Sequence, residues 1–259
     1  MSSKRIGIVT GASSGMGRDF IFEIVRSYPD LDEIWMVARR EERMRKVAKR
    51  IPMAARIFAM DLASGDYSLL EEELKKEAPE VKILINSSGF GRYGLFLEDD
   101  RKSQTDMVRV NCEALTAITH MVLPYMKSHG RIINMASSAA FLPQPKFTVY
   151  AATKAYVLSF TRALKTELAD RNLKITAVCP GPVATEFFGN AEGSSKLWYK
   201  EMIMAKSKKV VKLAFKDCSK NKDLSVYGWS IRGFYVISKI FPHSLLLKIV
   251  GKLNSKDQV

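Results

Sequence analysis

The chain of 259 residues carries 41 Lys and Arg against 27 Asp and Glu, a formal net charge of +14 at pH 7, and 47% of its residues are hydrophobic. This composition is typical of a soluble globular protein and excludes disordered and collagen-like chains. The length is near the upper limit for one hydrophobic core, so a single domain over residues 1–259 is expected rather than two small ones.

Cysteine and histidine are too few for a disulfide framework or a zinc site. The cysteines Cys112, Cys179 and Cys218 are odd in number and form no CxxC pair, and the three histidines have no spacing that completes a metal site with them. We therefore expect a reducing, cytoplasmic location and no metal. Only Lys4 and Arg5 precede the first apolar run, which leads directly into a candidate functional motif, so no cleaved signal peptide is expected.

Short β-branched runs alternate with longer amphipathic stretches, a pattern typical of repeated βα units around a parallel sheet. Seven strands are expected, at Arg5–Thr10, Glu33–Val37, Ala55–Ala59, Val81–Asn86, Arg131–Met135, Lys174–Val178 and Leu224–Tyr227. Helices are expected near Met16–Ser27, Glu41–Arg50, Tyr67–Glu77, Ser103–Met126 and Val149–Arg171. The predicted fold class is α/β, a doubly wound seven-stranded parallel sheet with helices on both faces.

A glycine-rich turn joins the first strand to the first helix. Glycines let the backbone approach a pyrophosphate closely, and the amino end of the following helix offers unpaired N–H groups and a favourable dipole. The alternative is a tight turn whose glycines serve conformation only, but the position directly after the first strand favours a nucleotide site. The cofactor contacts expected in this turn are Gly11, Ser13, Ser14, Gly15, Met16 and Gly17.

Further motifs follow in an order and spacing that resemble the short-chain dehydrogenase/reductase family. They are Asp61-Leu62, Asn86-Ser87-Ser88-Gly89, Asn111, Ser137, Tyr150 with Lys154, and Pro180 to Thr185. The resemblance covers nearly the whole chain and implies a single-domain Rossmann fold and a nicotinamide-dependent oxidoreductase. The family's usual Asn-Asn-Ala-Gly is changed at Ser87 and Ser88, where backbone contacts are expected to survive.

This resemblance also implies which residues hold the cofactor. Asp61 is expected to receive the adenine amino group, and the segment after the sixth strand to close on the nicotinamide carboxamide, with Val183 bonding through its backbone and Thr185 through its hydroxyl. The cofactor contacts implied outside the glycine turn are Asp61, Leu62, Asn86, Ser87, Gly89, Tyr150, Lys154, Pro180, Gly181, Val183 and Thr185.

The end of the second strand indicates which nicotinamide cofactor is used. An NAD enzyme places a carboxylate there, whereas this chain has Arg39 and Arg40, whose guanidinium groups pair with a 2′-phosphate. The alternative is that both arginines begin a solvated helix. A second marker of NADP in the family, a basic residue just before the second glycine, is absent because Ser14 stands there. The charge favours NADP(H).

Tyr150 and Lys154 are four positions apart on an expected helix, so their side chains share one face. A tyrosine with a pKa of about 10 is a poor proton shuttle at neutral pH, and we expect the neighbouring ammonium to favour the phenolate. The resemblance implies that Lys154 also binds the nicotinamide ribose. Such a pair alone is an ordinary helix surface, and the other motifs are what indicate catalysis.

Ser137 lies thirteen residues before Tyr150, at the carboxyl end of the fifth strand, where open α/β sheets bind ligands. The family resemblance includes this thirteen-residue spacing, and it implies that the hydroxyl of Ser137, in preference to that of Ser138, bonds the substrate oxygen. Asn111 would hold a water that connects Lys154 to solvent, and its alternative reading is an ordinary polar helix residue. The expected catalytic set is Asn111, Ser137, Tyr150 and Lys154, acting as hydride passes between nicotinamide and substrate.

The alternation of strands and helices lapses between Thr185 and Lys222, where Gly, Ser and Lys accumulate and a short helix near Lys206–Lys216 is expected. We interpret residues 186–222 as a lid over the ligand crevice. An apolar, fairly large substrate is expected, although the aromatic residues can instead pack the lid onto the body. The expected substrate contacts are Ser137, Phe141, Phe187, Phe188, Trp198 and Met202.

A lysine-rich segment and an apolar tail suggest what the protein can bind besides its cofactor. Residues 196–222 contain nine lysines against Glu201 and Asp217, which can attract an acidic substrate end or an anionic membrane, or form a solvated face. No nucleic-acid motif accompanies this charge. The tail, residues 229–259, is apolar and basic, and its charges and Pro242 argue against a membrane span. We expect it to contact the substrate mouth or a second subunit of a homodimer or homotetramer, ahead of a lipid interface.

The tail also resembles that of a bacterial subgroup of these reductases, which is similar to hydroxysteroid and long-chain ketoacyl reductases. We therefore expect an NADP(H)-dependent enzyme that interconverts a secondary alcohol and a ketone, with a hydroxysteroid-like substrate favoured. Two alternatives stay open at this point. One is a reductase of long-chain 3-oxoacyl thioesters, and the other is a catalytically silent dinucleotide-sensing or scaffold protein on the same fold.

Overall fold

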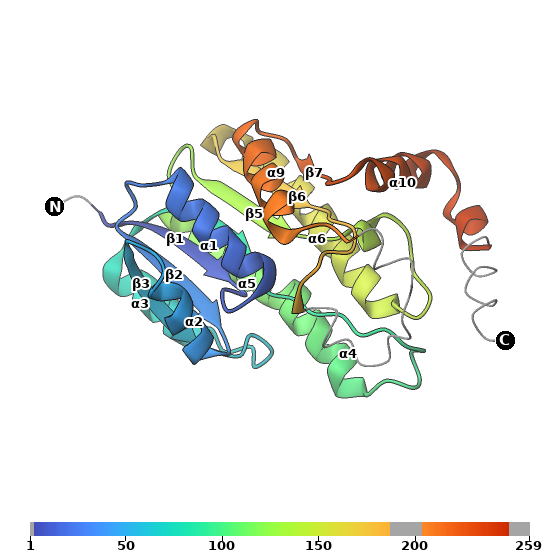
Figure 1. Ribbon diagram of the computed structural model, residues 1–259, viewed down its shortest axis with the longest axis horizontal. Helices are drawn as coiled ribbons and strands as arrows, with labels where there is room; N and C mark the ends of the chain where they lie inside the picture. The colour runs from blue at the N-terminus through green and yellow to red at the C-terminus, as the bar shows by residue number, and fades with distance from the viewer. Residues whose placement is uncertain (1–2, 187–203, 249–259) are drawn as a thin grey trace.

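The computed structural model describes residues 3–186 and 204–248. Within them, one parallel sheet has the strand order β3-β2-β1-β4-β5-β6-β7 (Figure 1). The strands are β1 Arg5–Thr10, β2 Glu33–Ala38, β3 Ala54–Ala59, β4 Glu80–Asn86, β5 Arg131–Met135, β6 Lys174–Val178 and β7 Leu224–Ser225. The predicted Rossmann-like α/β fold is confirmed, and β7 is shorter than expected.

The order of the strands determines where a ligand can bind. β1 lies between β2 and β4, so the chain leaves β1 toward one edge of the sheet and later returns to its other side. Such a reversal opens a crevice at the carboxyl ends of the neighbouring strands. All six residues of β2 are buried, as expected of a parallel strand covered on both faces.

Helices cover both faces of the sheet. On one face lie α1 Gly15–Ser27, α2 Glu41–Ala48 and α9 Ser207–Ser219, and on the other lie α3 Ser68–Glu77, α5 Ala114–Val122 and α6 Thr148–Glu167 (Figure 1). Each face has its own core: Phe20 packs with Met44 on the first, and Leu70 with Ile118 on the second. Fully burying one such side chain contributes about 1.5–3 kcal/mol.

The helix expected inside the lid is a structural helix of the sheet. The side chains of Val210, Val211, Ala214 and Phe215 in α9 are buried, and the Phe215 ring lies 5.9 Å from that of Phe20 in α1. The other face of this helix carries lysines. Because these lysines dominate the composition of the segment, the sequence suggested a basic lid rather than a core helix. Helix α9, the part of the expected lid segment 186–222 that the structure describes as a helix, thus packs in the core, and residues 187–203 lie outside the described part of the chain.

The long helix expected over Ser103–Met126 is interrupted. It consists of α4 Arg101–Val108, a π-helical turn Arg109–Glu113, α5, and a 3-10 turn Leu123–Tyr125. Asn111 lies in the π turn, where its buried side chain bonds to the loop after β4. Single π turns inside helices are frequent at functional sites. The helix expected over Val149–Arg171 likewise ends early, because α6 is followed by a 3-10 turn Ala169–Arg171.

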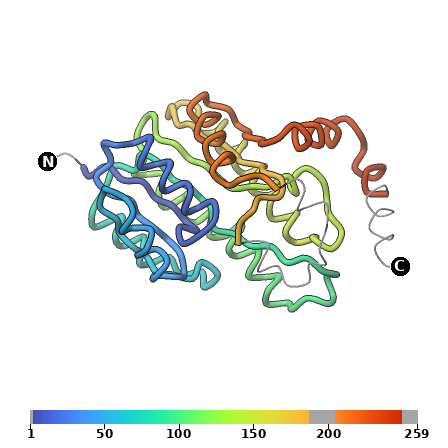
Figure 2. The backbone as a smooth tube through the Cα atoms, viewed as in Figure 1, coloured from blue at the N-terminus to red at the C-terminus, as the bar shows by residue number. Residues whose placement is uncertain are grey.

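The C-terminal segment leaves the sheet after β7. Helix α10, Trp229–Ile240, and a helical stretch at 243–248 follow at the end of the molecule opposite β3 (Figures 1 and 2). Tyr235 and Phe234 pack their rings on Phe141, with centroids 4.8 and 6.1 Å apart. No helix in residues 3–186 or 204–248 is long and apolar enough to cross a membrane.

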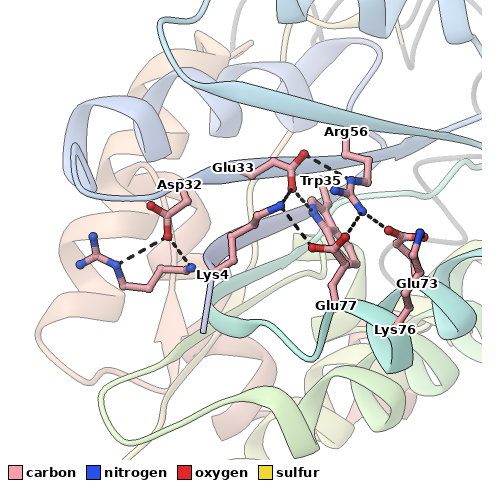
Figure 3. Close-up of polar contacts among 9 residues, drawn as sticks. Lys4, Asp32, Glu33, Trp35, Arg56, Glu73, Lys76 and Glu77 are labelled. Carbon is pink, nitrogen blue, oxygen red and sulfur yellow. Dashed lines mark hydrogen bonds and ion pairs between the residues drawn. The ribbon is translucent and has the colours of Figure 1, made fainter. Parts of the chain in front are cut away.

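A cluster of ion pairs closes the opposite edge of the sheet, at the amino ends of β1, β2 and β3 (Figure 3). Glu33, only 7% exposed, accepts hydrogen bonds from Lys4 Nζ at 3.4 Å, Trp35 Nε1 at 3.0 Å and Arg56 Nε at 3.3 Å. Lys4 also donates to Glu77. Because ligands of this fold bind at the carboxyl ends of the strands, the cluster is placed to stabilise the sheet rather than to meet a substrate.

Candidate active site

The glycine turn between β1 and α1 has a backbone that only glycine fits. Gly11 and Gly15 have φ angles of +68° and +51°, and a Cβ on Gly17 would lie 2.2 Å from the Gly11 carbonyl oxygen. The Ser14 side chain makes no capping hydrogen bond to α1, and the first turn holds no acidic residue. The amino end of α1 thus has the geometry and charge that suit a pyrophosphate.

The end of β4 packs closely on this turn. Thr10 Oγ1 accepts hydrogen bonds from the backbone N–H groups of Ser87 and Ser88, both at 3.1 Å. Ser87 and Ser88 contribute only their backbone N–H groups to these contacts, so a change of their side chains leaves the contacts in place. The Asn86 side chain is buried and donates to Thr119 and Asn134, both at 2.9 Å, so it ties β4 to α5 and β5.

Tyr150 and Lys154 project from α6 into the crevice at the end of β5. Lys154 Nζ donates to the Met135 carbonyl oxygen at 2.8 Å and lies over the Tyr150 ring, 5.6 Å from its centre. Burial lowers the pKa of Lys154 to about 8. Burial also raises the pKa of Tyr150 to about 12, although a hydrogen bond with Ser137 acts in the opposite direction.

This result corrects one expectation. The ammonium of Lys154 was expected to favour the phenolate of Tyr150, but in the protein alone the loss of hydration is the larger effect. The ammonium lies over the ring rather than at the hydroxyl, so it stabilises the phenolate weakly. Tyr150 is therefore protonated at neutral pH.

Ser137 lies between β5 and a 3-10 turn Ser138–Phe141. Its Oγ accepts a hydrogen bond from Ala139 N at 3.1 Å, which leaves its hydroxyl proton to donate. The neighbouring Ser138 instead uses its backbone N–H to bind the Pro180 carbonyl oxygen at 2.9 Å. The structure thus brings Ser137, and not Ser138, to the hydroxyl of Tyr150.

Asn111 braces the loop after β4. Its Oδ1 accepts from Phe90 N at 3.1 Å, and its Nδ2 donates to the Phe90 carbonyl oxygen and to Thr153 Oγ1, both at 3.0 Å. A Cβ on Gly89 would lie 2.9 Å from Asn111 Oδ1 and 3.3 Å from Lys154 Nζ. Gly89, Asn111 and Lys154 therefore lie close together at the end of β4, while the water expected at Asn111 stays a prediction.

A family comparison identifies this arrangement. The sequence profile of the family described as short chain dehydrogenase matches residues 5–195, a range that contains the glycine turn, Ser137, Tyr150 and Lys154. The chain belongs to the short-chain dehydrogenase family. As a short-chain dehydrogenase it is an oxidoreductase that acts on CH–OH groups of a small molecule and binds a nicotinamide dinucleotide.

Several curated proteins are similar to this short-chain dehydrogenase. Sulfoacetaldehyde reductase 2 of Chromohalobacter salexigens is 30% identical over 222 residues, which cover 81% of this chain and 86% of that protein. The 17-beta-hydroxysteroid dehydrogenase type 3 of Mus musculus and the very-long-chain 3-oxoacyl-CoA reductase-A of Danio rerio are each 30% identical over 190 residues. Those matches cover 69% of this chain, and 60% and 58% of the two proteins.

A solved structure supports the fold. A short-chain dehydrogenase from Sphingobium yanoikuyae in complex with NADPH superposes on this chain with a TM-score of 0.78 and 24% sequence identity. The superposition covers 97% of this chain and 95% of that one. The Rossmann fold of this short-chain dehydrogenase is therefore that of a dinucleotide-binding relative.

The two arginines after β2 differ in their contacts. Arg40 donates from Nη2 to Ser14 Oγ at 2.6 Å and Ser13 Oγ at 3.3 Å, so it lies against the glycine turn. Its Nη1 also pairs with Glu186 Oε2 at 3.2 Å, and Arg43 binds the same carboxylate. These pairs, that with Arg43 first, lower the pKa of Glu186. Both side chains are exposed, and it is Arg40 that contacts the glycine turn directly.

The remaining cofactor candidates differ in their surroundings. Asp61 is exposed and caps its own turn by accepting from Ala63 N at 3.1 Å, while Leu62 is buried. Thr185 approaches the glycine turn, because its Cβ lies 3.4 Å from where a Cβ on Gly15 would be. A Cβ on Gly181 would lie 2.7 Å from Ile231 Cδ1, so this loop packs closely on α10. Val183 is buried and bridges to Ala205.

Aromatic side chains line one wall beside Tyr150. The Phe147 ring lies 4.4 Å from that of Tyr150, and Tyr93 packs edge-on against Phe147 at 5.8 Å. A Cβ on Gly91 would lie 2.7 Å from the Tyr150 ring. The sequence analysis did not identify Gly91 as a site residue. The only signal for it in the sequence is a glycine in the loop after β4.

The substrate candidates are only partly described. Phe141 is 3% exposed and packs beneath α10, so its side chain belongs to the core in this structure rather than to the crevice. Phe187, Phe188, Trp198 and Met202 lie outside the described residues.

Proposed function

We propose that this short-chain dehydrogenase interconverts a secondary alcohol and a ketone on a fairly large apolar substrate with NADP(H), and that the substrate is hydroxysteroid-like. The observation that carries the proposal is the hydrogen bond between Ser137 and Tyr150, beside the buried Lys154. These three polar groups converge at the carboxyl end of β5, where open α/β sheets hold their ligands.

Each polar group has a separate proposed role at the substrate oxygen or the cofactor. The nicotinamide, when bound, supplies a hydride to the carbonyl carbon or takes it from the alcohol. Tyr150 is protonated at neutral pH and donates its hydroxyl proton to the carbonyl oxygen in the reductive direction. Ser137 donates a second hydrogen bond to the same oxygen and holds it against Tyr150. Lys154 is assigned the nicotinamide ribose, and Asn111 holds the loop after β4 in place.

We assign each part of the dinucleotide to residues at the carboxyl ends of the strands. The glycine turn, from Gly11 to Gly17, is assigned the pyrophosphate because its backbone and the amino end of α1 suit an anion. Asp61 and Leu62 are assigned the adenine. The nicotinamide end is assigned to the backbone of β4 from Asn86 to Gly89, and to the segment from Pro180 to Thr185.

The preference for NADP(H) rests on Arg40. The guanidinium of Arg40 is already held by the hydroxyls of Ser13 and Ser14, at the edge of the turn assigned to the pyrophosphate. A 2′-phosphate there would form charge-assisted hydrogen bonds with Arg40, which an unmodified ribose lacks. Arg39 is exposed on the same strand end and is assigned a secondary part.

The apolar substrate class rests on the aromatic wall of Phe147 and Tyr93 beside Tyr150. The murine relative named for hydroxysteroids supports the first choice. The relative from Danio rerio, named for very-long-chain 3-oxoacyl-CoA, supports the alternative of an acyl thioester. Like short-chain dehydrogenases in general, the protein is proposed to be a homodimer or homotetramer.

The function is tested by turnover. A panel of steroid ketones, bulky aromatic ketones and 3-oxoacyl thioesters is incubated with the protein and NADPH or NADH, and oxidation of the cofactor is followed by absorbance. We expect turnover of steroid ketones with NADPH, and turnover of the thioesters alone would move the assignment to the alternative. Tight NADPH binding with no turnover of any member would leave a dinucleotide-binding protein without catalysis.

A further inference from the structure

Helix α10 has two apolar faces, and only one of them packs on the protein. Its inward face carries Ile231, Phe234 and Tyr235, which meet Gly181 and Phe141. Ser238 on the same face is 3% exposed. This face attaches α10 firmly to the sheet, so the orientation of the helix on the body is set.

The opposite face is an apolar stripe exposed to solvent. Trp229, Gly233, Val236, Ile237 and Ile240 recur at the spacing of one helix face. Their exposed fractions are 86% for Trp229, 51% for Val236, 45% for Ile237 and 68% for Ile240. The stripe continues into Phe241 and Leu245, each 47% exposed. A single exposed apolar residue is ordinary, but a continuous stripe marks an interaction surface.

Basic groups accompany this stripe and acidic groups do not. The described residues 224–248 contain three Lys and Arg, namely Arg232, Lys239 and Lys248, and no Asp or Glu. Arg232 and Lys239 lie along one edge of α10, with the Arg232 guanidinium 5.4 Å from the centre of the Trp229 ring. At the amino end of the helix, Lys206, Lys209 and Ser230 line a hollow of about 300 Å³. Within the described residues neither of these two lysines forms an ion pair.

We propose that the outward face of α10 binds an anionic phospholipid surface, with the helix lying in the plane of the interface. Apolar side chains including a tryptophan, edged by basic residues, are the composition of interfacial helices. At 12 residues α10 is about 18 Å long, too short to cross the roughly 30 Å of a bilayer. Each Lys or Arg near an anionic membrane adds to the attraction.

Charge decides between a lipid surface and a second copy of this chain. If two α10 helices packed stripe to stripe in antiparallel orientation, Arg232 and Lys239 of both copies would lie along one seam, with no carboxylate on either helix to balance them. Like charges brought together in this way are destabilising. An anionic bilayer satisfies both the apolar stripe and its basic edge.

The test is cosedimentation of the full chain, loaded with NADPH, with vesicles of phosphatidylcholine alone or with roughly one third phosphatidylglycerol. We expect binding only to the vesicles that contain phosphatidylglycerol, and weaker binding as salt is added. The double variant Arg232→Gln with Lys239→Gln should lower the partition coefficient about tenfold or more, at roughly fivefold for each basic residue. Ile240→Ser should lower it as well, because it removes the apolar contact.

Two matched variants far from α10 serve as controls. Lys49→Gln removes an exposed charge at the end of α2, and Leu97→Ser removes an apolar side chain that is 93% exposed in the loop after β4. Both should bind vesicles like the unmodified protein. All variants should remain folded and keep the NADPH affinity of the original. The double variant also loses the hydrogen bond from Arg232 Nε to the Val226 carbonyl oxygen, so its melting temperature is compared before its vesicle binding is interpreted.

The remaining outcomes overturn the proposal. Absence of binding, equal binding to both vesicle types, or undiminished binding of the double variant would each remove the role of the basic edge. The molecular mass of each variant in solution is measured as well. Dissociation of an oligomer by Ile240→Ser, without any lipid binding, would assign the stripe to a second copy of the chain.

Discussion

Lys154 places its ammonium nitrogen over the Tyr150 ring, 5.6 Å from the ring centre, and both side chains are nearly fully buried. The two residues lie one helical turn apart on α6. Because burial disfavours the charged form of each group, the pKa of Lys154 falls to about 8 while that of Tyr150 rises to about 12. Tyr150 thus keeps its proton at neutral pH, whereas Lys154 loses its charge as the pH rises above about 8.

Removing the Tyr150 hydroxyl should abolish turnover with little change in cofactor binding. Tyr150→Phe deletes the proposed proton donor but keeps the ring against Phe147. Lys154→Met should reduce both turnover and NADPH affinity, since Lys154 is assigned two parts. Steady-state kinetics and NADPH titration check this. A Tyr150→Phe rate above about a tenth of the original, a change in barrier below about 1.4 kcal/mol, would contradict the assignment.

Affinity for NADPH should fall as pH rises through about 8, because the free protein then loses the Lys154 ammonium. The variant Lys154→Met should lack this step. For stability the sign is opposite: the unfolded chain holds the lysine proton up to its ordinary pKa of 10.5 while the folded chain does not. The free energy of unfolding should therefore rise between about pH 8 and 10.5 in the original, relative to Lys154→Met, in urea titrations.

Glu186 binds the guanidinium groups of Arg40 and Arg43, so in the proposed NADP(H) site its carboxylate would compete with the 2′-phosphate for them. Glu186→Gln should therefore improve NADPH affinity, by up to about fivefold for an exposed ion pair, without improving NADH affinity. Arg40→Asp should reverse the preference between the two cofactors. The matched control is Glu42→Gln, an exposed carboxylate on α2. If Glu186→Gln raised the affinity for NADH as much as that for NADPH, Glu186 would have no role in discriminating the 2′-phosphate.

The ion-pair cluster around Glu33 should affect stability but not catalysis. Glu33→Gln removes the charge that Lys4 and Arg56 share in a nearly buried position (Figure 3), at a cost of about 2 to 3 kcal/mol in the free energy of unfolding. Its kcat should stay that of the original at moderate temperature, because the cluster lies at the amino ends of the strands. Chemical denaturation measures the first effect, and a reduced kcat in the fully folded variant would contradict the second.

The sequence predicted the features that depend on local pattern. The predicted strand ends, the four-residue spacing and the family resemblance together indicated that Ser137, Tyr150 and Lys154 lie close to one another. The catalytic roles of these residues stay a prediction. The π turn at Asn111 was not predictable, because helical periodicity continues through it and only the contact with Phe90 requires the break. Burial reversed the expected pKa shift of Tyr150, since desolvation depends on neighbours distant in the sequence.

The Gly91 position offers a test of how closely Tyr150 must be held. A Cβ at Gly91 would lie 2.7 Å from Tyr150 Cδ2 and 3.1 Å from Phe147 Cζ, so Gly91→Ala must shift the tyrosine ring or the loop. The φ angle of Gly91 is not in the positive range, so the alanine backbone is unstrained and the effect comes from this contact.

Misplacement of a reacting group by about 1 Å can lower a rate about a hundredfold, and a smaller shift should lower kcat by about tenfold. Affinity for NADPH should change little, since Gly91 lies outside the residues assigned to the dinucleotide. The control is Gly94→Ala in the same loop, where an added Cβ meets nothing within 4 Å and the rate should stay that of the original. Equal kcat values for both variants would show that the loop yields and that the close packing on Tyr150 does not set the rate.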